Sequence, residues 1–202
     1  MRLALPAALI LAASPGLAFE PGTHGEPMEE EGYFVGCFSG EDGGSACEIH
    51  ARGAVFIAAS EGPSEPDALN ALAVLPQGAP VRFTGDMISM GDVTVEFALN
   101  TVTANPGDPL AALVQGLQGT WIKDGAEVTI TGLEWTEVEV ASYLISLGTA
   151  CSDGMERGAM HLSLYQMGGD PFTSICLEVV DQSEARTLLR DIATGQEVAL
   201  TR

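Results

Sequence analysis

The stretch Leu117-Gln118-Gly119-Thr120-Trp121-Ile122 marks the point where the pattern of the chain changes. Before it, apolar residues recur at helical spacing and predict a short amphipathic helix that ends at Gly119; they are Leu110, Leu113, Val114 and Leu117. After it, short segments in which polar and apolar residues alternate continue to the last residue, which predicts strands and no further helix. The second half of the chain is therefore expected to be an all-β unit that begins at Gly119.

The alternating pattern after Gly119 predicts eight short antiparallel strands. Eight such strands can close into an up-and-down barrel, which leaves no exposed sheet edge. A sheet folded over its own core, without a ligand, is the alternative. The expected strands are 119–123, 126–132, 134–140, 142–149, 158–166, 172–180, 185–191 and 196–202. Their inward side chains are expected to include Val128, Ile130, Met160, Leu162, Leu164, Ile175, Leu177, Val179, Leu188, Val198 and Leu200.

Gly-x-Trp at the head of such a series of strands resembles the opening strand of the lipocalin-like (calycin) barrels. The resemblance covers residues 117–202 and rests on Gly119, Trp121 and the terminal Arg202. It implies that Trp121 closes the base of the barrel and that Arg202, from the last strand, lies over its ring. All three residues would then have structural roles. The resemblance also implies a barrel that can hold a small apolar ligand.

Residues 33–104 form the first predicted unit, with the order strand-strand-strand-helix-strand-strand. A capping box at Ser64-Glu65-Pro66-Asp67 begins the helix. The unit resembles an OB-fold in element order and length. Only Arg52 and Arg82 could meet a phosphate, so the nucleic-acid binding of many OB-folds is not expected. A turn-rich boundary and the short helix occupy 105–118, and the lipocalin-like unit occupies 119–202.

The N-terminal 18 residues have the pattern of a secretory signal peptide. Arg2 precedes an apolar run from Leu3 to Ala13, and Gly16-Leu17-Ala18 is a small-x-small cleavage site. The run is too short to span a bilayer, so no membrane insertion is expected and the mature protein should begin at Phe19 in the periplasm or outside the cell. Residues 19–32 are rich in glutamate and are expected to form a disordered acidic arm.

Four cysteines in an exported chain point to two disulfides, for which three connectivities exist. Cys37 and Cys47 flank a glycine-rich turn, which favours a bond across a hairpin. Cys151 and Cys176 would then pair within the second half. Each bond should stabilise its unit by roughly 3 kcal/mol in the chain-entropy model. This pairing leaves no cysteine for catalysis.

The acidic composition excludes several classes of partner. The chain has 28 acidic and eight basic residues and a net charge of −20, so nucleic acid and anionic membranes are disfavoured. The acidic residues are scattered and lack the spacing of a calcium loop, so no metal or other cofactor is expected. His50 and His161 fall in different halves, and His161 is expected on a solvated outer strand face. No catalytic residue can therefore be assigned from the sequence.

These observations favour an exported, mostly β, non-catalytic binding or interaction protein with two small barrels. Its partner would be a small apolar ligand in the second barrel or a protein on its surface. A hydrolase that uses unidentified acidic residues and a structural envelope protein are the alternatives. An apolar pocket near Trp121 and Trp135 would favour binding, whereas a cleft with convergent carboxylates would favour the hydrolase.

Overall fold

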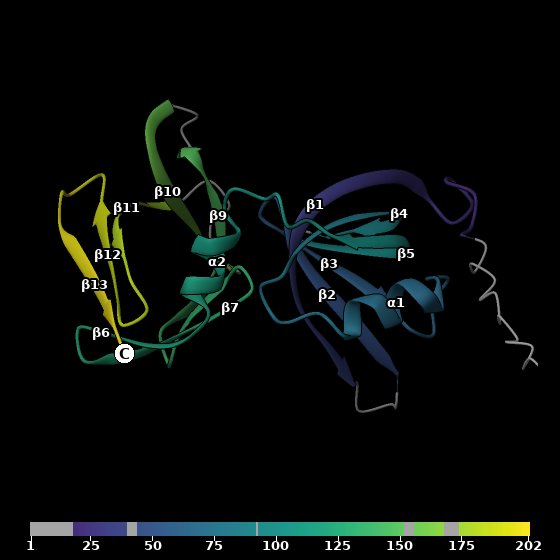
Figure 1. The fold of residues 1–202 in the computed structure, drawn as a ribbon, viewed down its shortest axis with the longest axis horizontal. Coiled ribbons are helices and arrows are strands. Elements are labelled where there is room, and N and C mark those ends of the chain that lie inside the picture. The colour runs from purple at the N-terminus through teal and green to yellow at the C-terminus, as the bar shows by residue number, and fades with distance from the viewer. Residues whose placement is uncertain (1–17, 40–43, 92, 152–155, 168–173) are drawn as a thin grey trace, which may run out of the picture.

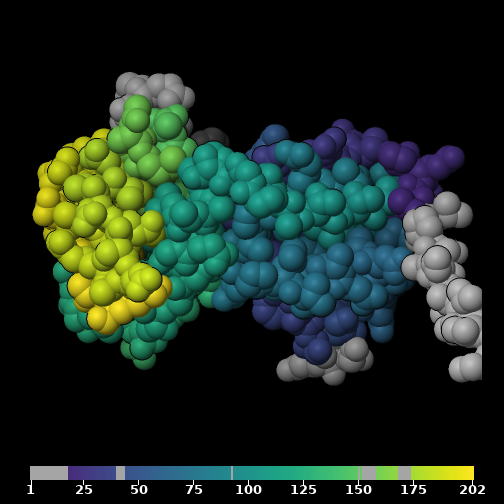
Figure 2. All heavy atoms as spheres, in the orientation of Figure 1, coloured from purple at the N-terminus to yellow at the C-terminus, as the bar shows by residue number. Residues whose placement is uncertain are grey.

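The computed structural model describes residues 18–39, 44–91, 93–151, 156–167 and 174–202. The protein is mostly β, as expected, and consists of two closed barrels joined by a segment that contains one short helix. The barrels lie side by side as two lobes (Figures 1 and 2). Apart from Ala18, the predicted signal peptide lies outside the described residues.

The first barrel has the strand order β1-β2-β3-β5-β4 and is closed by pairing of β1 with β4. Among its described strand pairs, only β3 and β5 are parallel, since a closed barrel with an odd number of strands cannot pair all of them antiparallel. This confirms the predicted order of elements. Phe56, Phe83 and Phe97 fill the centre, with ring centroids 5.4–5.7 Å apart. The elements are β1 (Glu26–Ser39), β2 (Ser45–Ala51), β3 (Ala54–Ala59), α1 (Pro66–Ala73), β4 (Pro80–Met90) and β5 (Thr94–Ala104).

The prediction of a disordered acidic arm over residues 19–32 is wrong. Residues from Glu26 onward belong to β1, and the pairs from Glu26↔Met87 to Gly32↔Val81 close the barrel. Strand pairing uses backbone groups, so a strand that contains the consecutive residues Glu29, Glu30 and Glu31 can still form one side of a barrel. Two of the glutamates form ion pairs, Glu30 with Arg52 at 2.9 Å and Glu31 with Arg82. The high charge of this segment concealed the strand.

The second barrel has eight antiparallel strands, as predicted, and α2 (Ala111–Leu117) precedes it. Its last strand pairs with its first through Leu200↔Lys123 and Thr201↔Ile122, which closes it. One inward prediction is wrong: Leu189, not Leu188, is fully buried, and it pairs with Val179 of the neighbouring strand, which packs against the core. The strands are β6 (Gly119–Lys123), β7 (Ala126–Thr131), β8 (Glu134–Glu137), β9 (Ala141–Ala150), β10 (Glu156–Gln166), β11 (Ser174–Gln182), β12 (Arg186–Asp191) and β13 (Glu197–Thr201).

Both predicted disulfides are present. Cys37 and Cys47 face each other in the pairing of β1 with β2, and Cys151 is bonded to Cys176 on β11. Two disulfides are typical of a protein from an oxidising compartment outside the cytoplasm. In the part of the chain that the structure describes, no helix has both the length and the apolar character needed to cross a membrane.

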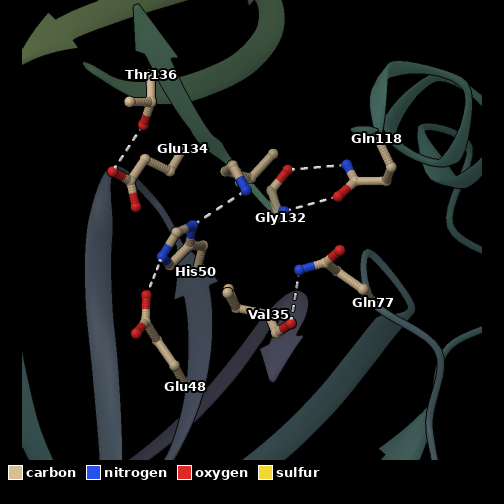
Figure 3. A network of polar contacts seen from close by, with 9 residues as sticks. Val35, Glu48, His50, Gln77, Gln118, Gly132, Glu134 and Thr136 are labelled. Atoms are coloured by element: carbon tan, nitrogen blue, oxygen red, sulfur yellow. Dashed lines mark hydrogen bonds and ion pairs between the residues drawn. The ribbon is translucent and has the colours of Figure 1, made fainter. Parts of the chain in front are cut away.

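The two barrels contact each other through buried polar groups (Figure 3). The side chain of His50, on β2, is 1% exposed; its Nδ1 accepts a hydrogen bond from the Leu133 amide at 3.0 Å, and its Nε2 lies 2.5 Å from Glu48 Oε1. Leu133 and Gly132 form the turn between β7 and β8. Gln118 also holds this turn, since its side chain forms hydrogen bonds with both the amide and the carbonyl of Gly132. The base of the second barrel is therefore docked against the first barrel.

Tyr33 adds an apolar contact to this junction. It belongs to β1 of the first barrel, yet its ring packs into the core of the second. Its hydroxyl donates a hydrogen bond to Asp108 Oδ2 at 2.8 Å, in the segment that joins the barrels. Burial, together with this hydrogen bond and the negative charge of Asp108, raises the pKa of the Tyr33 phenol above its ordinary value.

Candidate functional site

The two ends of the second barrel differ in construction. At the end where β6 begins, Trp121 is fully buried and its indole N–H donates to the Leu117 carbonyl at 2.7 Å, at the end of α2. The guanidinium carbon of Arg202 lies 4.0 Å from the centre of the Trp121 ring, and Arg202 also donates to the carbonyls of Gly116 and Gln118. Gly119 has a φ of 101°, a conformation that favours glycine. These contacts close the base.

The opposite end, which we call the mouth, contains a cavity of 240 Å³. It lies where β6, β8 and β12 end and where β9, β11 and β13 begin. Trp135 and Tyr143 line it together with aliphatic side chains, so its walls combine aromatic and apolar surface with a few charges. The lining residues are Lys123, Asp124, Trp135, Glu137, Tyr143, Leu164, Ile175, Leu177, Asp191, Gln196 and Val198.

A charged cluster at the mouth follows from the alternation of the strands. Lys123 lies two residues after the buried Trp121, and Glu137 lies two residues after the buried Trp135, so both charged side chains point into the barrel. Lys123 Nζ lies 2.5 Å from Glu137 Oε1 and 5.8 Å from the centre of the Trp135 ring. Trp135 Nε1 donates to the same carboxylate oxygen at 3.0 Å. Side-chain exposures of 27% for Lys123 and 17% for Glu137 leave the pair partly accessible.

The rest of the mouth is acidic. Asp124 and Asp191 also line the cavity, so one lysine faces three carboxylates. Asp191 Oδ1 accepts hydrogen bonds from the amides of Ala193 and Thr194 at 2.8 and 3.1 Å, which fixes the turn between β12 and β13. Asp124 has a φ of 52° in the turn after β6. Both aspartates are thus placed by turn geometry at the entrance.

Chemically, this arrangement can hold a small molecule with an apolar part and a positively charged part. Leu164, Leu177 and Val198 offer aliphatic contacts. The face of Trp135 and the carboxylate of Glu137 already hold one cation, the ammonium of Lys123. An anionic ligand would have to approach a mouth in which carboxylates outnumber the single ammonium.

A second group of potential ligands lies on the outside of the same barrel. Among the described residues, the ligand atoms of Cys151, His161 and Cys176 lie within 4.8 Å of one another. The two sulfurs are bonded to each other, so they are not available as thiolate ligands. The prediction of a solvated His161 is wrong, because the residue is 1% exposed and Nδ1 lies 2.8 Å from the Ala159 carbonyl. The strand face expected to be open to solvent is covered at this position.

Sequence reasoning singled out the base residues and missed those of the mouth. Gly119, Trp121 and Arg202 come together at the base, and the pocket lies beside Trp135 rather than Trp121. Neither Lys123 nor Glu137 was selected as a site residue. A usable signal was present, since each charged residue follows an inward tryptophan by two positions on a strand.

Comparison of the chain with known protein families, with curated proteins and with solved structures found no match.

Proposed function

We propose that this chain is an exported, non-catalytic binding protein whose second barrel holds a small ligand with a compact apolar body and a cationic group. The observation that carries the proposal is the mouth cavity, in which Glu137 and Trp135 hold the ammonium of Lys123 beside apolar walls. The proposal keeps the small ligand expected from the sequence and adds a charged group to it.

The size of the cavity limits the ligand. A cavity of about 150 Å³ can hold benzene, and drug-sized ligands occupy pockets of roughly 300–1,000 Å³. The mouth cavity, at 240 Å³, falls between these values. A single ring or a short alkyl chain with one substituent fits this space, whereas a long fatty acid does not.

The charge of the mouth sets the preferred head group. An ammonium from a ligand would take the place of the Lys123 ammonium, whose side chain is 27% exposed and can turn to solvent, and would then meet the same carboxylate and tryptophan face. Asp124 and Asp191 leave the mouth negative even after Lys123 has neutralised Glu137. Val138 and Val140, in the turn between β8 and β9, are 57% and 69% exposed and give the entrance an apolar lip.

The architecture supports this function. An eight-stranded antiparallel barrel with a tryptophan under an arginine at its base resembles the lipocalin-like barrels, and the first barrel resembles an OB-fold in strand order. Docking of the base against the first barrel leaves the mouth as the free end. The disulfides and the N-terminal apolar run support placement in the periplasm or outside the cell.

A hydrolase is the second candidate, because Glu137 and Asp191 line the same cavity. General acid–base catalysis needs carboxylates that are free to exchange protons with a substrate. Glu137 is held by Lys123 and by the indole N–H of Trp135, and Asp191 is held by two turn amides. These contacts disfavour proton exchange with a substrate, whereas attraction of a ligand cation needs only the net negative charge of the mouth.

The test compares three probes of the same shape: benzylammonium, benzyl alcohol and benzoate. Isothermal titration should show the tightest binding for benzylammonium and the weakest for benzoate. Glu137→Gln should remove most of the preference for the cation. Glu127→Gln serves as the matched control, since Glu127 is an exposed residue on the neighbouring strand β7. Equal or tighter binding of benzoate, or no binding of any probe, would contradict the proposal.

A further inference from the structure

The segment that follows the predicted cleavage site is fixed on the first barrel. Asp86, a fully buried residue of β4, accepts hydrogen bonds from the backbone amides of Gly22 and His24 at 2.7 and 2.8 Å. Burial by itself would raise the pKa of Asp86, but these amides and the nearby His24 hold that pKa below its ordinary value. The carboxylate therefore stays charged and acts as an anchor for the turn.

Phe19 is held by a second buried residue. Asn100, on β5, is 8% exposed, and its Nδ2 donates to the Phe19 carbonyl at 2.8 Å. The Phe19 ring contacts the His24 ring edge-on, with centroids 4.8 Å apart. The other polar atom of this amide, Oδ1, is buried without a hydrogen-bond partner among the described residues. A buried acceptor without a donor is unfavourable, so this atom marks a place for an N–H group.

A cavity lies at this position. Its volume is 220 Å³, and its lining includes Ala18, Asn100, Glu65 and Asp67. Ala18 is the last residue of the predicted signal peptide, so the bond to Phe19 lies at the edge of the cavity. Glu65 and Asp67 flank the start of α1, whose macrodipole places about half a positive charge there. Two carboxylates outweigh that half charge, so the cavity favours a cation.

We propose that cleavage between Ala18 and Phe19 creates the ligand of this cavity, the α-ammonium group of Phe19. A signal peptidase hydrolyses the bond with water: the hydroxyl oxygen goes to the Ala18 carbonyl, which leaves as a carboxylate, and the new amine takes up a proton. The uncleaved chain offers one neutral amide N–H at this point, whereas the α-ammonium offers three N–H donors and a positive charge. Asn100 Oδ1 accepts one donor, and Glu65 and Asp67 compensate the charge.

Processing thus locks the new N-terminus onto the first barrel and stabilises the mature form over the precursor. This inference is independent of ligand binding by the second barrel.

The experiment first measures the intact mass of the protein exported with its own leader, which should correspond to a chain that begins at Phe19. NMR titration of ¹⁵N-labelled Phe19 then gives the pKa of the α-amino group, which in unperturbed chains is about 7.7–8.0. We expect a value about one pH unit higher, because two carboxylates and a buried carbonyl favour the charged form. In a second protein that retains Ala18 as its first residue, the α-amino group belongs to Ala18. The pKa of that group, measured with ¹⁵N-labelled alanine, should have the ordinary value.

The double variant Glu65→Gln with Asp67→Asn should bring the α-amino pKa of the Phe19 chain back toward the ordinary range. Glu184→Gln, which changes an exposed acidic residue outside the cavity, is the control and should leave the raised value unchanged. A mature chain that begins elsewhere would overturn the inference. An α-amino pKa that is the same in both proteins, or that does not respond to the double variant, would overturn it as well.

Discussion

The second barrel has a tryptophan and a basic residue at each end, and the two pairs have opposite roles. At the base, the Trp121 N–H donates to a backbone carbonyl, and Arg202 lies 4.0 Å from its ring centre. At the mouth, the Trp135 N–H donates to the side chain of Glu137, and Lys123 lies 5.8 Å from its ring centre. A backbone partner fixes the first pair in place. The second pair is instead joined through the side chain of Glu137, and a cavity lies beside it.

The largest effect on stability is expected at the base. Trp121→Ala should lower the free energy of unfolding by about 3–5 kcal/mol, the range for removing a buried aromatic side chain. Chemical denaturation of the full-length mature chain measures this effect. Tyr165→Ala, at a partly exposed position on β10, is a suitable control and should cost less. Equal losses for the two variants would show that Trp121 does not hold the base together.

A smaller loss is expected when the mouth pair is broken. Lys123→Met leaves Glu137 without its cation and should cost about 1–3 kcal/mol, between the values for exposed and buried pairs. The double variant Lys123→Met with Glu137→Leu should recover part of that loss, because no unpaired charge remains. Denaturant midpoints of the three proteins give the result. A double variant less stable than Lys123→Met would contradict the view that the pair serves binding more than stability.

Removal of the terminal arginine should have a modest effect. Deletion of Thr201 and Arg202 removes the cation over Trp121 and one pair between β13 and β6, so a loss of about 0.5–2 kcal/mol is expected from the cation–π contact. The variant Arg202→Lys keeps the positive charge but lacks the planar guanidinium group that donates to two carbonyls. It therefore separates the contribution of the charge from that of these hydrogen bonds. Thermal melting of each protein checks this expectation. A deletion without effect would mean that the C-terminus is not part of the closure.

The smallest effect is expected from alkaline pH at the junction of the barrels. The raised pKa of Tyr33 means that the folded state favours its protonated phenol, so this stabilisation is present below pH 10 and is lost as pH rises above that value. Tyr33→Phe should be less sensitive to alkali than the parent protein between pH 9 and about pH 11. Unfolding curves at each pH measure the difference. An identical pH dependence in the two proteins would show that the phenol is not linked to stability.

The sequence predicted what depends on local pattern. Alternation in short segments identified the eight strands after Gly119, and the order of elements identified the first barrel. Cys37 and Cys47 could be paired because the glycine-rich stretch between them predicts a hairpin, and they do face each other in the pairing of β1 with β2. Each of these features is encoded within a few neighbouring residues.

What could not be predicted depends on contacts between distant segments. Strand β1 extends through glutamates because β4 supplies its hydrogen-bond partners, and these lie far away in the chain, as Glu26↔Met87 and Glu31↔Arg82 show. The site at the mouth needs Lys123 and Glu137 on non-adjacent strands of a closed barrel. His161 is buried although its strand alternation places it outside. Charged residues in the sequence were expected to face solvent, whereas closure of the barrels buries Asp86 and places Lys123 and Glu137 inside the second barrel.

The two tryptophans allow a direct test of the difference between base and mouth. The chain has only two, so its ¹H–¹⁵N spectrum contains two indole signals, which Trp121→Phe and Trp135→Phe assign. Titration with benzylammonium should move the Trp135 indole signal in a saturable way and leave the Trp121 signal in place. Movement of the Trp121 signal alone, of both signals equally, or of neither would contradict a ligand site at the mouth of the second barrel.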